Sequence, residues 1–418
     1  MKFLRTVSTR RLLALIAGLV IVVGGGTAIA VAAAGPGPVP TPKPLAAALH
    51  DALKAPQVAG ITANISFTNN LIGSADLAGG QGPSDPILTG ATGRLCRGSG
   101  HRIRLELQSD NCDAQVVVNN GSFWISDPSS HTVYEGSLPA DHSGAAKPAS
   151  AKPDAHQGLP TIAEIQSDLN KLMKHVDVSG ATPGDVAGQA AYTVSIAPKH
   201  DGGLLGQAEV AWDAVRGVPL RIAIYARGNS TPVLELKATD ISYGQVPASD
   251  FNVSPPAGSK VVKIATASGH ANGMGSAAKL HRLGKRAHSQ RVNGVAAVAA
   301  KLPFKLVAPK SLVGLPRHTV TLLDWGGKPA ALVAYGQNLG GIAVIEQTQV
   351  AKDAGSGKAS AGSGQSALSL PTVSINGASG QELDTALGTM VRFSRGGVSY
   401  MVLGSVPSAA ADAAARAL

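Results

Sequence analysis

Apolar and polar residues alternate along several short stretches of the first half of the chain, which predicts β-strands with one apolar and one solvated face. In residues 102–108, Ile103, Leu105 and Leu107 alternate with charged side chains. The same alternation recurs in residues 219–226 and 233–238. Turns rich in glycine and asparagine separate these stretches, so their short spacing predicts an antiparallel meander.

Two stretches with helical periodicity accompany the predicted strands. Residues 45–54 favour a short helix that ends before Pro56. Thr161 and Glu164 have the spacing of a capping box, and an apolar stripe follows them through about residue 174. A sheet with one apolar face must cover that face, so we expect these two helices to plug it.

Two short helices are expected to leave part of a large curved sheet uncovered. The apolar surface that remains is either side-chain core or a ligand cavity, and the pattern leaves both interpretations open. The candidate ligand-binding residues on this concave face are Phe67, Ile103, Leu105, Leu107, Phe123, Ile125, Ile165, Leu169, Trp212, Leu220, Ile222, Ile224, Leu234 and Leu236.

The N-terminus has the pattern of a membrane-targeting segment. Basic residues ending in Arg10 and Arg11 precede residues 12–34, which carry no charge. A helix of that length would reach about 34 Å, enough to cross the hydrocarbon core of a bilayer. We therefore expect a single-pass signal anchor with a cytoplasmic N-terminus and residues 35–418 outside the cytoplasm. The small residues at 28–34 also fit a cleaved signal peptide and a secreted protein, so both alternatives stay open.

The rest of the chain divides into a tether, a linker and a second folded region. Residues 35–44 contain five prolines and predict an extended tether, and residues 45–258 contain the meander. Residues 259–294 are rich in Gly, Ala, Ser and basic residues and predict a linker. Residues 295–418 predict a smaller antiparallel α+β domain. Its expected elements are a short helix at 296–302, strands at 319–323, 330–334, 341–346, 387–393 and 397–404, and a closing helix at 408–418.

The net charge of +10 is confined to two places. Four of these charges lie in residues 1–11 and five in residues 279–291, so the remainder is close to neutral. A nucleic-acid-binding domain would carry basic residues on a folded face, often beside aromatic side chains, and aromatic residues are only 4% of this chain. We therefore expect no nucleic-acid partner. The basic stretch 279–291 is either a solvated linker or a contact for anionic lipid head groups.

Sequence motifs of catalysis and metal binding are missing. The eleven histidines form no HExxH or other ligand spacing, and no GxSxG motif is present. We therefore expect no enzyme, no metal site and no cofactor. Cys96 and Cys112 would be exposed to an oxidising compartment, which favours a disulfide. A simple meander places them about 20 Å apart, too far for a bridge, so this pairing stays open.

Two parts of the sequence resemble known families. The segments WD at 212–213, VPLRI at 218–222, 234–243, VP at 246–247 and FNVSPPAG at 251–258 resemble the closing strands of the LolA superfamily. That group includes LolA, LolB, the LppX/LprG lipid carriers and the N-terminal domain of RseB/MucB. The ending GTMVRFSRGGVSYMVLGSVP at 388–407, with the helix after it, resembles the C-terminal domain of RseB/MucB and DUF4367-type modules.

These resemblances imply an α+β protein of the cell envelope. After a single transmembrane segment, a curved antiparallel half-barrel sheet plugged by helices would precede the smaller α+β domain. The first functional hypothesis is a membrane-tethered lipoprotein carrier or presenter that binds a lipid or lipoprotein acyl chain. The alternative is a regulator of the RseB/MucB kind that binds an anti-sigma factor or another single-span membrane partner.

Overall fold

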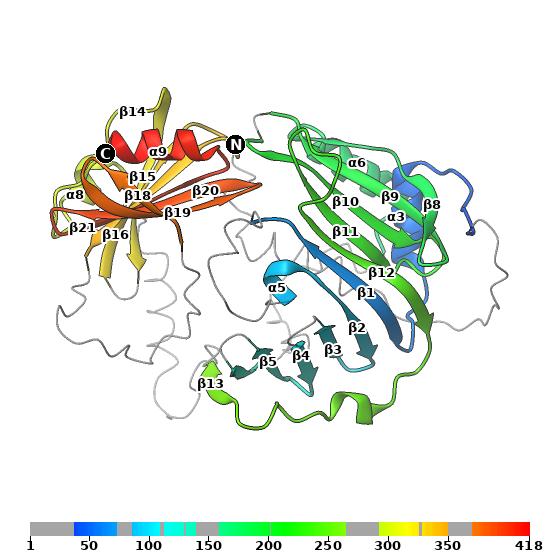
Figure 1. Ribbon diagram of the computed structural model, residues 1–418. Coiled ribbons are helices and arrows are strands. Elements are labelled where there is room, and N and C mark those ends of the chain that lie inside the picture. The colour runs from blue at the N-terminus through cyan, green and yellow to red at the C-terminus, as the bar shows by residue number, and fades with distance from the viewer. Residues whose placement is uncertain are drawn as a thin grey trace, which may run out of the picture.

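The computed structural model describes residues 37–72, 86–108, 113–128, 131–138, 159–200, 202–264, 292–325, 328–349 and 370–418. These residues are mostly β-structure with few helices, arranged in two sheets that follow one another along the chain (Figure 1). The first sheet has thirteen strands and the second has eight.

The first sheet is a curled antiparallel half-barrel with one parallel strand at its edge. Its spatial order is β13-β6-β5-β4-β3-β2-β1-β12-β11-β10-β9-β7, with β8 also paired to β9. The strands are β1 Ile61–Asn69, β2 Ala91–Gly98, β3 Arg102–Gln108, β4 Asp113–Asn119, β5 Ser122–Asp127, β6 Thr132–Ser137, β7 Val176–Val178, β8 Thr182–Val186, β9 Gln189–Pro198, β10 Leu205–Asp213, β11 Pro219–Ala226, β12 Leu234–Tyr243 and β13 Lys260–Ile264.

The register of these strands sorts their side chains onto two faces. Directly paired residues share a face, and successive residues alternate between faces. Leu95 of β2 pairs with Ala63 of β1 and with Leu105 of β3, while Ile241 of β12 pairs with Ala63. An apolar face therefore runs continuously across the sheet. We call the opposite side the polar face.

Two helices cover one end of the apolar face. Helix α3 (Leu45–Lys54) buries Ala48 in a cluster with Tyr192 of β9 and Trp212 of β10. Helix α6 (Ile162–Leu172) packs against α3, and Figure 1 shows both helices behind β9 and β10. The predicted capping box is confirmed, because Thr161 accepts a hydrogen bond from the Glu164 amide and the Glu164 carboxylate accepts one from the Thr161 amide. The short helix α5 (Pro86–Thr89) contacts β1, β3 and β4.

The polar face is covered at the opposite end by the chain that follows β12. This segment contains the 3₁₀ helix η2 (Ala248–Phe251) and continues to β13. Phe251 is 1% exposed and packs against Cys96 and Val246. The indole of Trp124 donates a hydrogen bond to the Val253 carbonyl at 3.2 Å. These contacts fix this segment on the polar face of β2–β5.

The second sheet is smaller and its core is continuous. Its order is β14-β15-β16-β17-β21-β20-β19-β18, all antiparallel. Helices α8 (Val295–Ala299) and α9 (Ser408–Arg416) pack on it. The strands are β14 Ser311–Leu312, β15 Leu315–Trp325, β16 Lys328–Tyr335, β17 Ile342–Thr348, β18 Thr372–Ile375, β19 Ala378–Thr385, β20 Gly388–Arg395 and β21 Val398–Gly404.

Two sets of hydrogen bonds join the sheets. The Ala386 amide, in the turn between β19 and β20, donates to the Leu71 carbonyl at 2.9 Å. The Leu204 amide donates to both the carbonyl and the hydroxyl of Ser405, at 3.1 and 2.9 Å. The Ser405 hydroxyl in turn donates to the Leu387 carbonyl. Both contacts on the second sheet are therefore part of one structured corner.

The structure corrects two details of the sequence interpretation. Residues 260–264, predicted to begin the linker, form β13, which pairs in parallel with β6. Five residues are too few for their alternation to stand out, and the partner strand lies far away in the sequence. The end of the predicted tether is also attached to the fold. Tyr192 donates a hydrogen bond to the Thr41 carbonyl, and the backbone of Lys43 forms an isolated antiparallel β-bridge with that of Ala181.

The predicted membrane-spanning segment, residues 12–34, lies outside the described residues, as does the basic stretch 279–291. Within the described ranges, no helix combines the length and hydropathy that crossing a bilayer requires.

Candidate ligand-binding face

Twelve of the fourteen candidate residues lie on strands of the first sheet, and the register places all twelve on the apolar face. The strand alternation read from the sequence therefore identified one surface rather than scattered positions. The other two, Ile165 and Leu169, lie on α6, where Ile165 is buried and Leu169 is half-buried.

Five of these residues belong to the packed core of the sheet. Leu107 and Leu220 are buried in a cluster centred on β1, with Phe67 and Leu105 packed around it. Trp212 lies under α3, and its ring centroid is 6.1 Å from that of Tyr192. For these positions the core interpretation holds, because other side chains of the protein already cover them.

The remaining seven strand residues belong to none of the hydrophobic clusters that the described residues form. They fall into two groups on either side of the packed core. One group lies on β11 and β12 and consists of Ile222, Ile224, Leu234 and Leu236, of which Leu236 is 39% exposed. The other we call the outer patch. It lies on β3–β5 and consists of Ile103, Phe123 and Ile125 with the neighbouring Val116 and Val118, all half-buried.

One charged side chain lies on this face and was not among the candidate residues named from the sequence. Arg97 of β2 pairs with Ile61 of β1 and Ile103 of β3, so it shares the apolar face with them. It is half-buried, and desolvation lowers the pKa of its guanidinium. The signal was present in the sequence, because Arg97 lies two residues from Leu95 and therefore on the same face of a strand.

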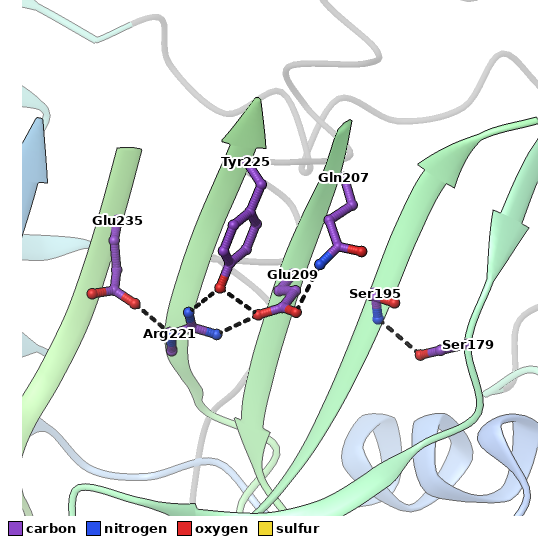
Figure 2. A network of polar contacts seen from close by, with 7 residues as sticks. All are labelled: Ser179, Ser195, Gln207, Glu209, Arg221, Tyr225 and Glu235. Carbon is purple, nitrogen blue, oxygen red and sulfur yellow. Dashed lines mark hydrogen bonds and ion pairs between the residues drawn. The ribbon is translucent and has the colours of Figure 1, made fainter. Parts of the chain in front are cut away.

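The polar face of β10–β12 carries a cross-strand ion-pair network (Figure 2). Arg221 donates to Glu209 at 2.7 Å, to Glu235 at 2.6 Å and to the Tyr225 hydroxyl at 2.6 Å. Tyr225 donates to Glu209 at 2.9 Å, and Gln207 donates to the same carboxylate.

Burial acts to lower the pKa of Arg221, but its hydrogen bonds to Glu209, Tyr225 and Glu235 outweigh it and raise that pKa. Desolvation raises the pKa of the Tyr225 hydroxyl. Arg221 therefore stays charged and Tyr225 neutral. The network satisfies its own members and holds three strands in register, and it presents no activated nucleophile or base.

A cavity of about 460 Å³ lies beside this network. None of the fourteen candidate residues lines it. It is lined by Asp185, Val186, Ala187, Thr193, Arg221, Lys237, Ala238 and Thr239. Polar and apolar side chains share its walls, and it lies apart from the outer patch.

The described residues contain no group of three or more His, Cys, Asp or Glu side chains placed to hold a metal ion. Cys96 is a free, buried cysteine on the polar face, packed against Val246 and Phe251. Its proposed partner, Cys112, lies outside the described residues.

No protein-family model and no curated protein matches the sequence. Solved structures similar to the chain include proteins of the two groups that the sequence resembles. The MucA/MucB complex of Pseudomonas aeruginosa is 16% identical over 88% of this chain and 94% of that chain, with a TM-score of 0.38. A LolA superfamily protein from Nitrosomonas europaea is 8% identical over 50% of this chain and 98% of that chain, with a TM-score of 0.18.

A putative outer membrane lipoprotein-sorting protein domain from Vibrio parahaemolyticus is 12% identical over 50% of this chain and 96% of that chain, with a TM-score of 0.17. All three TM-scores lie below 0.5, so any function has to be inferred from the chain's own residues.

Proposed function

We propose that this protein is an extracytoplasmic, membrane-tethered binding protein whose apolar face accepts a lipid or a lipoprotein acyl chain. The observation that supports this is the group of seven large apolar side chains that share one face of the first sheet and join no hydrophobic cluster of the described residues. Proteins rarely leave groups of large apolar side chains outside their packed core without using them for binding.

The energy available from this surface is sufficient for binding. Covering about 300 Å² of apolar area would contribute about 7 kcal/mol before the cost of association. Helices α3 and α6 do not supply that cover at β3–β5, because α3 packs on β9 and β10 and α6 packs on α3. Helix α5 does contact β3 and β4, but the side chains of the outer patch still join no hydrophobic cluster of the described residues. A flexible acyl chain needs no specific polar partner, which agrees with the apolar character of the outer patch.

Uptake of a fluorescent fatty acid by the full chain tests this proposal. The Ile125→Gln variant places a polar group in the outer patch, so we expect uptake to weaken about tenfold. The matched control is Ile162→Gln, because Ile162 is 47% exposed on α6 and lies outside the apolar face of the sheet. Full uptake by Ile125→Gln, or none by the unmodified protein, would contradict a lipid-binding role for this face.

A regulator that binds a single-span membrane protein is the second candidate. The observation in its favour is the hydrogen-bonded corner that joins the second sheet to the first through Leu71 and Leu204. A pure carrier has no need of this second sheet. Capture of a single-span protein from solubilised membranes by the full chain, undiminished in Ile125→Gln, would favour the regulator over the carrier.

A further inference from the structure

The second sheet has another apolar face, opposite the one that forms its core. Directly paired residues share a face, and along one row Leu332 of β16 pairs with Ile345 of β17, which pairs with Met401 of β21. We call this side of the second sheet the back face. The apolar residues that the register places on it are Leu323, Leu332, Ala334, Ala343, Ile345, Leu383, Met390, Met401 and Leu403.

The back face is separate from the packed core of the second sheet. Helices α8 and α9 pack on the opposite side, where Val298 and Ala411 join the one large cluster. The nine residues of the back face join no hydrophobic cluster of the described residues. Ile345 is 8% exposed and Leu403 is 36% exposed, while the other large side chains are half-buried.

The sequences of these strands are typical of strands that are covered on both faces. Residues 330–335 read AALVAY and residues 398–403 read VSYMVL, so apolar side chains occupy both faces of β16 and β21. Near-continuous apolar runs of this kind mark strands with two covered faces, whereas a strand with one solvated face alternates. Strand β3 of the first sheet, with the sequence RIRLELQ, does alternate. A second layer is therefore expected on the back face.

The charged side chains on the back face are basic. In β16, β17 and β19–β21, all of whose residues are described, the register places Lys328 and Arg392 there and no acidic residue. Both cations are exposed, and neither forms a hydrogen bond or an ion pair with the described part of the chain. The carboxylates of the same strands, Glu346, Glu382 and Asp384, lie on the core side. A partner with acidic residues would complement this face.

The size of the back face favours a single helix over a second copy of the chain. From β16 to β19 it spans four strand spacings, about 19 Å, and along β16 residues 330–334 span about 13 Å. This footprint of about 250 Å² is well below the roughly 800 Å² that each partner of a standard interface buries. An α-helix is about 10 Å wide, and about thirteen residues of it cover 19 Å. Half-buried side chains of a sheet do not protrude into a bilayer, but a helix can lie on them.

We propose that the back face is the docking surface for an acidic, amphipathic helix of a partner protein, whose apolar stripe covers this face and whose carboxylates pair with Lys328 and Arg392. The inference goes beyond lipid binding by the first sheet and does not depend on it. Met390 and Met401 suit such a surface, because their flexible thioether side chains adapt to the shape of a partner. The guanidinium of Arg392 offers several N–H donors in a planar fork, which matches a carboxylate.

Binding of two synthetic helical peptides to the full chain tests the proposal. Both peptides carry one stripe of leucines on an alanine background. One has glutamates beside the stripe, and the other has lysines at the same positions. Fluorescence anisotropy of the labelled peptides measures their binding at low ionic strength. We expect the acidic peptide to bind at least about tenfold more tightly than the basic one, and added salt to reduce the difference, because screening weakens exposed ion pairs.

Two pairs of variants locate the peptide on the back face. Leu403→Gln places a polar group there and should weaken binding of the acidic peptide about tenfold. Its matched control is Leu339→Gln, because Leu339 is 54% exposed in the turn between β16 and β17 rather than on a strand. Arg392→Gln should reduce the preference for the acidic peptide. Arg94→Gln, exposed on the polar face of the first sheet, should leave that preference unchanged.

Several outcomes would overturn the proposal. These are no binding of either peptide, equal binding of both, and full binding of the acidic peptide by Leu403→Gln. Loss of peptide binding in Ile125→Gln instead would place the peptide on the first sheet. A dimer of the full chain in sedimentation, dissociated by Leu403→Gln, would make a second copy the occupant.

The test is independent of the lipid-binding function, because Leu403→Gln should leave uptake of the fluorescent fatty acid unchanged. If Leu403→Gln does not fold, judged by its circular dichroism, the comparison of the two peptides on the unmodified protein still decides.

Discussion

The apolar faces of the two sheets are covered in different ways. In the second sheet, eight strands share a single cluster of eighteen buried residues, which α8, α9 and residues 302–308 help to cover. In the first sheet, thirteen strands divide their buried residues among four clusters, the largest of which has eleven. A larger sheet thus has the smaller continuous core.

This difference distinguishes a continuous packed core from a sheet face that is packed only in part. A closed core gains stability from every side chain on its inner face, since those side chains contact each other. The half-buried apolar side chains outside the clusters of the first sheet make fewer such contacts, and under the proposed function they are the ones that a ligand would cover. The comparison therefore predicts that equivalent substitutions have unequal effects on stability in the two sheets.

The largest expected difference in stability is between two phenylalanine-to-alanine substitutions, one in each sheet. Phe393 of β20 is 2% exposed and stacks on Tyr400 with ring centroids 5.0 Å apart. Phe393→Ala should lower the free energy of unfolding of the second sheet by about 3–5 kcal/mol, because it leaves a cavity in a continuous core. Phe123→Ala, on the half-buried outer patch, should cost about 1 kcal/mol. Urea unfolding followed by circular dichroism measures both, and similar losses would mean that the outer patch is ordinary core.

A somewhat smaller effect on stability, which depends on pH, is expected from a carboxylate buried in the second sheet. Glu346 of β17 is fully buried, and one of its oxygens accepts a hydrogen bond from the Val307 amide at 2.9 Å, while the other has no partner among the described residues. Desolvation raises the pKa of Glu346 from 4.5 to about 7, partly opposed by the Val307 amide. Desolvation and the nearby Glu346 together raise the pKa of Tyr335 to about 12.

The sign of the pH dependence follows from this raised pKa. Between pH 4.5 and 7 the folded state keeps a proton that the unfolded state has lost, so stability is highest below pH 4.5 and falls as pH rises to about 7. The total loss is about 3 kcal/mol. Glu346→Gln should remove this slope in urea unfolding at pH 5 and pH 8. The control Asp240→Asn, exposed on β12 of the first sheet, should leave it unchanged. If the stability of Glu346→Gln still falls between pH 5 and pH 8, other groups cause the pH dependence.

Local patterns in the sequence predicted much of both sheets. The alternation in residues 102–108 and 219–226 located β3 and β11 and the face that Ile103 and Ile222 share, because a period of two needs no tertiary information. The expected strands of the second sheet correspond to β15, β16, β17, β20 and β21, and its closing helix to α9. The strands β14, β18 and β19 were not predicted.

Other features depend on contacts distant in sequence, and no local pattern could supply them. The division of the apolar face into packed core and outer patch is one such feature, because Leu107 and Ile103 look alike in the sequence but only Leu107 is buried in the cluster centred on β1. The parallel pairing of β13 with β6 joins segments more than a hundred residues apart. Glu346 likewise interrupts an apolar strand, and only the strand partners show that it is buried.

The smallest expected effect concerns the corner where the two sheets meet. Gly203 has a φ of +62°, and a Cβ atom placed on it would lie 2.2 Å from the Ser405 carbonyl oxygen of the second sheet. Gly188 has a similar φ of +73°, but a Cβ atom there would meet nothing within 4 Å. Alanine at either position costs about 1 kcal/mol of backbone strain, because φ is positive at both. Only Gly203→Ala also adds a clash with Ser405, which pushes the two sheets apart.

We therefore expect Gly188→Ala to keep the two sheets joined and Gly203→Ala to weaken the hydrogen bonds of Leu204 to Ser405, at an additional cost of about 1 kcal/mol. Paired spin labels, one on each sheet, measure the separation directly, and the distance distribution should broaden in Gly203→Ala alone. If the two variants give the same distribution, the corner does not hold the sheets together, and the open first sheet and the closed second sheet act independently of each other.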